Sequence, residues 1–180
     1  MTDLWVVLVT GSRFWDDAWS VKNELDRVVA EAHADGCREF ILRQGACYPP
    51  ADRVTGIRPN RSADWLAHLW FLKYARLSPI EVMIEQERPA DWEAPCRPAC
   101  NQRTHRGRNV NHRRPRGTKT YCPLAGRHRN RDMVLEDPRP ALGLAFHRDN
   151  SGGTEHCMTT MREFGIEVRS VPYQLKGSPC

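Results

Sequence analysis

Short apolar runs alternate with segments of helical periodicity along the chain. Such runs cover residues 4–9, 40–42 and 141–146, and two apolar patterns that include charged residues cover 80–84 and 167–171; we expect each of the five to be a strand. Strands that alternate with helices form parallel sheets, because each helical crossover returns the chain to the same end of the sheet. The pattern therefore predicts an α/β fold built on a doubly wound parallel sheet of about five strands.

Helices are expected between these strands. The first has apolar residues at helical spacing and ends at Gly36, and the second is capped by Ser62. The third begins around His128, and the fourth follows a turn at residues 151–154. Residues 47–61 contain three prolines and show no period, so they are expected to form a loop.

The first strand leads into the turn Gly11-Ser12-Arg13 and then into a helical pattern. At such a junction the amino terminus of the helix offers unpaired N–H groups and the positive end of its dipole to an anion. Three further turns follow a strand or open a helix, at residues 45–46, 129–130 and 151–154. Because the carboxyl ends of parallel strands meet at one edge of the sheet, the four turns are expected to line one crevice.

The residue types of this crevice suit a nucleotide. The candidate ligand-binding residues are Gly11, Ser12, Arg13, Gly45, Ala46, Asp64, Arg129, Asn130, Ser151, Gly152, Gly153 and Thr154. We expect Gly11 and residues 152–154 near phosphates, with Arg13 or Arg129 supplying a bidentate charge. Asn130 or Asp64 would contact ribose hydroxyls. The alternative is that the glycines only terminate strands, but the occurrence of four such turns favours a crevice.

The bulk composition predicts one globular domain. A chain of 180 residues with 40% hydrophobic content can bury a core, and we expect residues 1–175 to form the domain and 176–180 a loose tail. No apolar run approaches the roughly 18 residues of a membrane span, so no membrane partner is expected. Residues 4–9 lack a following small-residue cleavage site, which predicts a cytoplasmic protein. The sequence leaves open whether the protein is a homo-oligomer.

The net charge of +5 conceals one strongly basic segment. Residues 94–131 contain eleven of the 27 Lys and Arg residues and no Asp or Glu, whereas the remainder has 16 basic and 22 acidic residues, a net charge of −6. The chain is therefore predicted to be a mildly acidic domain with a basic insert at residues 94–125. Such an insert can meet phosphate or nucleic acid, or it can be a solvated loop.

The insert also holds cysteine and histidine residues that suggest a metal site. Three of the seven cysteines of the chain fall within it, which in a reducing compartment favours a metal over disulfides. The preferred ligands are Cys96, Cys100, His112 and Cys122, with His105 as the substitute for His112. A structural Zn²⁺ would order a segment that has too few apolar residues for its own core. The alternative is a disordered arm with incidental cysteines.

Several motifs occur in the order seen in a known family. They are Val-Thr-Gly-Ser-Arg-Phe-Trp-Asp-Asp (9–17), Gln-Gly-Ala-Cys-Tyr-Pro (44–49), Ser-Ala-Asp-Trp-Leu-Ala (62–67), Pro-Ala-Asp-Trp (89–92), Ala-Gly-Arg-His-Arg-Asn-Arg-Asp-Met-Val (125–134), Ala-Phe (145–146) and Ser-Gly-Gly-Thr (151–154). In these motifs the chain resembles the YspA-like branch of the SLOG superfamily, over nearly its whole length apart from the insert and the tail. The resemblance implies a Rossmann-like fold and a nucleotide or a nucleotide-derived, NAD- or ADP-ribose-like ligand.

The superfamily also includes phosphoribohydrolases, which cleave an N-glycosidic bond. The resemblance implies that such an enzyme would use Arg129 to orient the phosphoribose and Glu155 or Asp64 as the acid/base. Glu155 is out of register with the family glutamate, however, and the in-register residue is Cys157. Nucleotide binding or sensing is therefore the first hypothesis, and hydrolysis of a nucleoside 5'-monophosphate is the second. Nucleic-acid binding ranks third, because the insert has one aromatic residue for base stacking, Tyr121.

Overall fold

The computed structural model describes residues 3–94, 97, 100, 122, 124–148 and 151–173. Five strands form one sheet in the order β3-β2-β1-β4-β5, and all four neighbouring pairs are parallel. The strands are β1 (Leu4–Gly11), β2 (Glu39–Gln44), β3 (Val82–Glu87), β4 (Leu142–Phe146) and β5 (Glu167–Val171). The predicted Rossmann-like, doubly wound parallel sheet is thereby confirmed.

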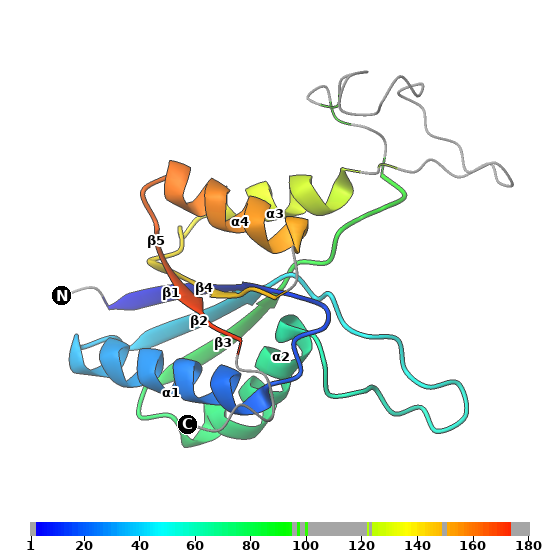
Figure 1. Ribbon diagram of the computed structural model, residues 1–180. Coiled ribbons are helices and arrows are strands. Elements are labelled where there is room, and N and C mark those ends of the chain that lie inside the picture. Colours follow the sequence, from blue (N-terminus) through cyan, green and yellow to red (C-terminus); the bar gives the residue numbers. More distant parts are fainter. Residues whose placement is uncertain are drawn as a thin grey trace, which may run out of the picture.

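Two layers of helices cover the sheet (Figure 1). Helices α1 (Ala18–Ala34) and α2 (Ala63–Tyr74) lie on one face, and α3 (Ala125–Leu135) and α4 (Gly152–Glu163) lie on the other. A short 3₁₀ helix, η1 (Ala75–Leu77), extends α2. Among the residues that the structure describes, no helix combines the length and apolarity that crossing a membrane would need.

The winding of the sheet reverses at β1. This strand pairs with β2 on one side, where Val9 is matched with Gln44, and with β4 on the other, where Gly11 is matched with Phe146. After β3 the chain passes through α3 and enters β4 on the far side of β1. In an open α/β sheet, such a reversal leaves a crevice beyond the carboxyl ends of the two strands, and ligands bind there.

Alternate residues of β1 belong to separate cores on the two faces of the sheet. Val7 is in the same buried cluster as Leu25 of α1, whereas Leu8 is clustered with Met133 of α3 and Met161 of α4. Successive side chains of a strand point to opposite faces, so a strand covered on both faces must be apolar throughout. This requirement explains the continuous apolar run by which the sequence identifies β1.

Arg43 of β2 is a charged residue in the interior of the protein. Its side chain has no exposed surface, and it donates hydrogen bonds to backbone oxygens at and after the end of α3, those of Met133 (2.8 Å), Glu136 (3.0 Å) and Pro138 (3.1 Å). A fourth bond goes to Oε1 of Gln86 on β3 (2.8 Å). Burial lowers the pKa of Arg43. Because its donors are satisfied in this way, the buried side chain holds the end of α3 against the sheet.

Some element boundaries differ from the prediction. β3 runs from Val82 to Glu87, whereas the sequence predicts residues 80–84. The predicted end is too early because this edge strand continues through glutamates, which an apolar pattern does not include. α3 begins at Ala125 and not around His128, and no side chain bonds to its first N–H groups to mark the start. The expected turn at residues 151–154 forms the first turn of α4.

Ser62 precedes α2 as predicted, but its side chain does not cap the helix. Its hydroxyl instead donates to the carbonyl oxygen of Cys47 (2.7 Å), and the residue has a φ of +81°. Ser62 therefore fastens the loop after β2 to the start of α2, and the capping prediction is wrong.

Gly11→Ala is expected to destabilise the protein by about 1 to 3 kcal/mol, because a side chain at this position has no space. Its Cβ would lie 2.3 Å from Cβ of Ala63 and 2.9 Å from Cβ of Phe146. Gly152→Ala is the matched control, since nothing lies within 4 Å of a Cβ built there. Urea denaturation of the two variants measures the difference. Equal free energies of unfolding would contradict the close approach at Gly11.

Candidate functional site

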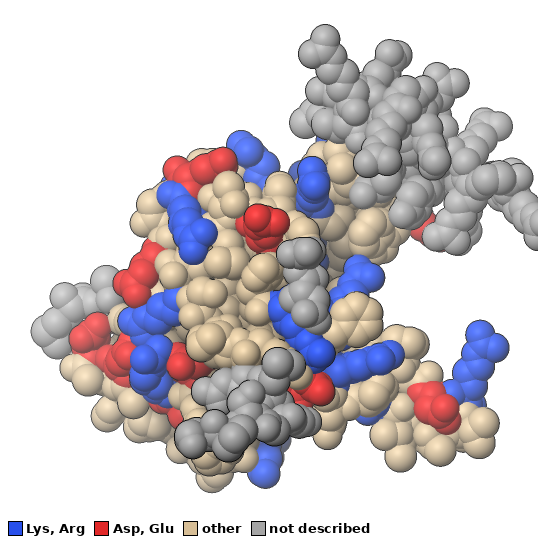
Figure 2. All heavy atoms as spheres, in the orientation of Figure 1, with Lys and Arg blue, Asp and Glu red and all other residues tan. Residues whose placement is uncertain are grey.

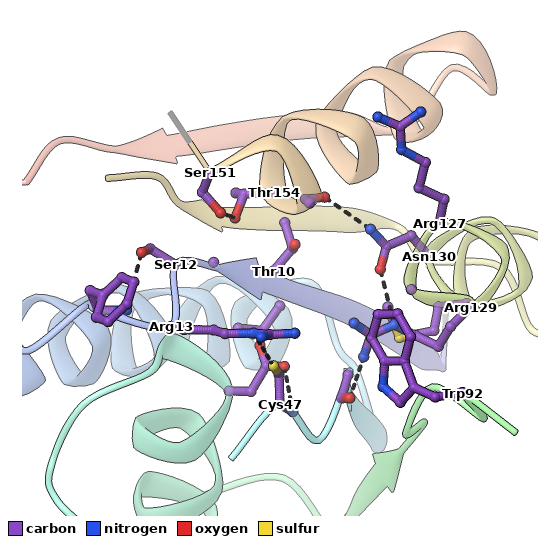
Figure 3. A pocket seen from close by; sticks show the side chains of 18 residues that line it. Thr10, Ser12, Arg13, Cys47, Trp92, Arg127, Arg129, Asn130, Ser151 and Thr154 are labelled. Carbon is purple, nitrogen blue, oxygen red and sulfur yellow. Dashed lines mark hydrogen bonds between the residues drawn. The ribbon is translucent and has the colours of Figure 1, made fainter. Parts of the chain in front are cut away.

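The carboxyl ends of β1 and β4 open into a cavity of about 420 Å³ (Figure 3). Residues 9–14 form one wall, and α3 with the amino terminus of α4 forms the opposite wall. Gly45 and Cys47 line it from the loop after β2, and Asp64 lines it from α2. The volume lies within the range of small-molecule sites, and the position is the reversal point of the sheet.

A second cavity of about 440 Å³ adjoins the first. The residues that line both are Arg13, Phe14, Gly45, Cys47, Trp92 and Arg129. The residues that line only the second cavity come from the loop after β2, from the residue before Ser62 and from the segment after β3; they are Ala46, Tyr48, Pro49, Pro50, Arg61, Pro89 and Ala90. The two spaces thus form one cleft with two compartments, which suits a ligand that has two chemically different parts.

The structure brings together most of the residues that the sequence selects. Of the twelve predicted ligand-binding residues, ten line the first cavity, Ala46 lines the second, and Gly152 lines neither of them. The four turns come from separate parts of the chain and meet because the strands are parallel. Their grouping at one edge of the sheet follows the geometry that the sequence analysis predicts.

The lining of the first cavity is positively charged. It contains Arg13, Arg127 and Arg129, and Asp64 is the sole carboxylate among its described residues. Figure 2 shows blue Lys and Arg side chains bordering the hollow on the right-hand side of this face. A cleft lined mainly by one sign of charge attracts a ligand of the opposite sign, so the first cavity favours an anion.

Arg129 of α3 is held against the ends of two strands. Its Nη1 donates to the carbonyl oxygen of Gly45, just after β2, and to that of Arg88, just after β3 (3.1 Å). A side chain at position 45 would displace the guanidinium from this position, because a Cβ there would lie 1.7 Å from Nη1 of Arg129. Arg129 therefore joins α3 to the edge of the sheet and places its charge beside both cavities.

Arg13 and Cys47 meet across the cleft (Figure 3). Nε of Arg13 donates to Sγ of Cys47 (2.9 Å), and the arginine side chain is otherwise exposed. Burial raises the pKa of the Cys47 thiol, so the thiol is neutral at pH 7 and does not balance the guanidinium charge. The charge of Arg13 is therefore available to a ligand.

Asn130 connects α3 with the amino terminus of α4. Its buried side chain donates from Nδ2 to the carbonyl oxygen of Gly153 (2.9 Å) and accepts at Oδ1 from Nε of Arg129 (3.0 Å). Ser151 and Thr154 hydrogen-bond to each other through their hydroxyls (2.8 Å), and Ser151 makes no side-chain bond to the first N–H groups of α4. The positive end of this helix thus lies at the cavity with backbone donors for an anion.

Asp64 lies in the first turn of α2, and its side chain is buried within the site. The residue is 4% exposed, and its Oδ2 accepts a hydrogen bond from the backbone N–H of Cys47 (3.0 Å). Burial raises the pKa of Asp64, although the charges of Arg129 and Arg13 and the Cys47 hydrogen bond act in the opposite direction. Its carboxyl group is therefore in an environment that favours protonation more than water does.

Glu155, the other predicted acid/base, is exposed on α4 and lines neither cavity. The in-register residue, Cys157, is fully buried, and burial raises the pKa of its thiol to about 11. A thiol with such a pKa stays protonated at pH 7 and is not a base. Of the two predicted carboxylates, only Asp64 is placed at the cavity in the described part of the chain.

Trp92 and Phe14 are site residues that the sequence analysis does not select. Trp92 lines both cavities, and its indole ring packs 3.3 Å from where a Cβ of Gly126 would lie, at the start of α3. The ring of Phe14 is 61% exposed and has the guanidinium of Arg61 over it at 6.0 Å. Trp92 belongs to the motif at residues 89–92, which could have marked it as a site residue. Its contact with α3 could not be predicted, because more than thirty residues of sequence separate Trp92 from that helix.

Two thiols and an imidazole form a separate cluster beside the cleft. Sγ of Cys100 lies 3.8 Å from Sγ of Cys122 and 2.8 Å from Nε2 of His128, and both cysteines are buried. The sequence selects Cys100 and Cys122 but not His128, which lies on the first turns of α3. The other predicted ligands, Cys96, His105 and His112, lie outside the described residues.

Asp64→Asn is expected to raise the free energy of unfolding at pH 7, because it removes a buried charge and keeps an oxygen for the Cys47 N–H. The pKa of Asp64 is raised by folding, so the folded protein binds this proton more tightly than the unfolded chain does. Wild-type stability therefore rises as the pH falls through that raised pKa, and the advantage of the variant shrinks. Urea denaturation at pH 7 and at about pH 4 measures both effects. A variant that is less stable at pH 7 would contradict this assignment.

Comparisons of the chain with models of known protein families, with curated proteins and with solved structures found no match. The family resemblance of its motifs therefore stays a prediction from the sequence. The function has to be inferred from the chemistry of the cleft.

Proposed function

We propose that this protein is a SLOG-type module that binds a nucleotide or a nucleotide derivative resembling NAD or ADP-ribose. One observation carries the proposal: at the reversal point of the sheet, three arginines and the amino terminus of α4 surround a cavity with a single carboxylate among its described lining. Phosphate groups fit the cationic side of such a cavity, and hydroxyl groups fit the carboxylate.

The phosphate end of the ligand is assigned to α4 and Arg13. The first backbone N–H groups of a helix have no partner within the helix, and the helix dipole adds a partial positive charge. Gly153 and Thr154 line the cavity at this terminus, and the exposed guanidinium of Arg13 lies opposite them. Arginine adds a planar fork of donors that matches the geometry of phosphate oxygens.

The sugar and base are assigned to Asp64, Trp92 and Phe14. A carboxylate accepts hydrogen bonds from ribose hydroxyls, and Asp64 is the described carboxylate of the first cavity. Trp92 and Phe14 line both compartments and offer aromatic faces on which a base can stack. The second compartment gives room for the further group that a dinucleotide or ADP-ribose carries.

Arg13→Ala is expected to weaken the binding of ADP-ribose by about 1.5 to 3 kcal/mol, the loss typical of a charge-assisted hydrogen bond. Arg131→Ala is the matched control, because Arg131 is exposed on α3, packs over the ring of Phe164 and lines neither cavity. Isothermal titration with AMP, ADP, NAD and ADP-ribose measures the affinities. Equal losses in the two variants would show that Arg13 acts only through net charge. No binding of any of these ligands to the wild-type protein would overturn the proposal.

Hydrolysis of a nucleoside 5'-monophosphate is the second candidate, and it depends on Asp64. A buried carboxyl group with a raised pKa is suited to donate a proton to a leaving base, with Arg129 near the phosphoribose. Chromatography of the same mixtures after incubation tests it. Free base that is released by the wild-type protein but not by Asp64→Asn would establish catalysis. Binding without release of free base would show that the protein is a binding module.

A further inference from the structure

A small buried cluster lies at the junction between the cleft and the start of α3. Cys100, Cys122 and Ala125 are buried together, with Trp92 and Leu124 packed against them. His128 completes the group from α3, and one ligand atom from each of Cys100, Cys122 and His128 lies within 4.8 Å of the others. The nucleotide proposed above makes no use of these three side chains.

The distance between the two sulfur atoms distinguishes a disulfide from a pair of ligands on one metal ion. A disulfide requires about 2.05 Å, and Sγ of Cys100 lies 3.8 Å from Sγ of Cys122. In a tetrahedral zinc site with Zn–S bonds of about 2.3 Å, two sulfur ligands are about 3.8 Å apart. The observed separation is therefore too long for a disulfide and matches that of two sulfur ligands on one ion.

The imidazole is placed for the same ion. Tetrahedral geometry would put a nitrogen ligand about 3.6 Å from each sulfur, so the 2.8 Å contact between Sγ of Cys100 and Nε2 of His128 has to open by less than about 1 Å. The three ligand atoms already lie within 4.8 Å of one another.

We propose that Cys100, Cys122 and His128 bind a zinc ion. Thiolate and imidazole are the donors that zinc prefers, whereas magnesium and calcium take oxygen ligands. The proposal is confined to these three ligands. The sequence-based choice of Cys96 and His112, with His105 as the substitute for His112, stays a prediction, because these residues lie outside the described part of the chain.

The ion would clamp one wall of the cleft. The backbone N–H of Cys122 donates to the carbonyl oxygen of Trp92 (3.0 Å), and the N–H of Ala125 at the start of α3 donates to the carbonyl oxygen of Cys122 (3.1 Å). His128 directly precedes Arg129. A zinc ion would therefore join the segment that carries Trp92 to the helix that carries Arg129, which is the role of a structural metal.

A second group of metal-binding residue types provides a contrast. His68, Glu85 and Glu87 also lie close together, but Tyr48 donates to Glu87 (2.6 Å) and Gln44 donates to Glu85 (3.1 Å). These contacts explain that group as a hydrogen-bonded network at the edge of the sheet. We assign no metal to it.

Elemental analysis of untagged protein, purified without chelators and dialysed after exposure to Zn²⁺, tests the site. We expect about one zinc per chain in the wild type and a loss of at least about tenfold in zinc content with Cys122→Ser or His128→Ala. Cys47→Ser and His33→Ala are matched controls, since Cys47 lies in the cleft and His33 near the end of α1, and both should keep the ion.

Two further measurements distinguish the loss of a metal ligand from a folding defect. Circular dichroism establishes that each variant retains its sheet and helices. Cobalt added to the metal-free wild type should give the charge-transfer and d–d absorption of a tetrahedral thiolate site, and Cys122→Ser should weaken these bands. Zinc near zero in the folded wild type, or zinc retained in folded Cys122→Ser and His128→Ala, would overturn the proposal. Neither outcome depends on nucleotide binding.

Discussion

The contact between the guanidinium of Arg129 and the carbonyl oxygen of Gly45 is the constraint on which the cleft depends. It brings α3 to the ends of β2 and β3, with a further bond to the carbonyl of Arg88. Glycine at position 45 leaves room for the guanidinium as it stands, because a Cβ there would lie 1.7 Å from Nη1. With α3 fixed there, Asn130 reaches Gly153 and sets the amino terminus of α4 beside β1. The two cavities are the space that remains between these elements.

The electrostatics of the cleft follow from this packing. Burial raises the pKa of both Asp64 and the Cys47 thiol. Ionisation of the two groups that could offset the arginine charges is therefore less favourable than it is in water. Backbone N–H groups at α4 add a partial positive charge on the same side. The cleft therefore carries an excess of positive potential that an anionic ligand would neutralise. Its aromatic side chains give the remainder of such a ligand an apolar surface.

The sequence predicted the sheet well because strands covered on both faces are apolar throughout. The rule does not extend to the two edge strands: β5 was predicted with its observed limits from Val168 and Val171 among polar residues, whereas β3 was misplaced because its glutamates break the pattern. The turns of the cleft were predictable from the rule that parallel strands end at one edge. Trp92 and His128 were missed as partners of the site, because their positions depend on where α3 begins. A helix start without a capping side chain leaves no local signal for that point.

Hydrogen–deuterium exchange, measured with and without saturating ADP-ribose, tests most directly whether this cleft holds a nucleotide. A bound phosphate would accept hydrogen bonds from backbone N–H groups and slow their exchange. The account predicts slower exchange at residues 11–14, 45–47 and 152–155, with the outer loop at residues 51–59 unchanged. Unchanged exchange at all three segments, or slower exchange confined to other parts of the chain, would contradict it.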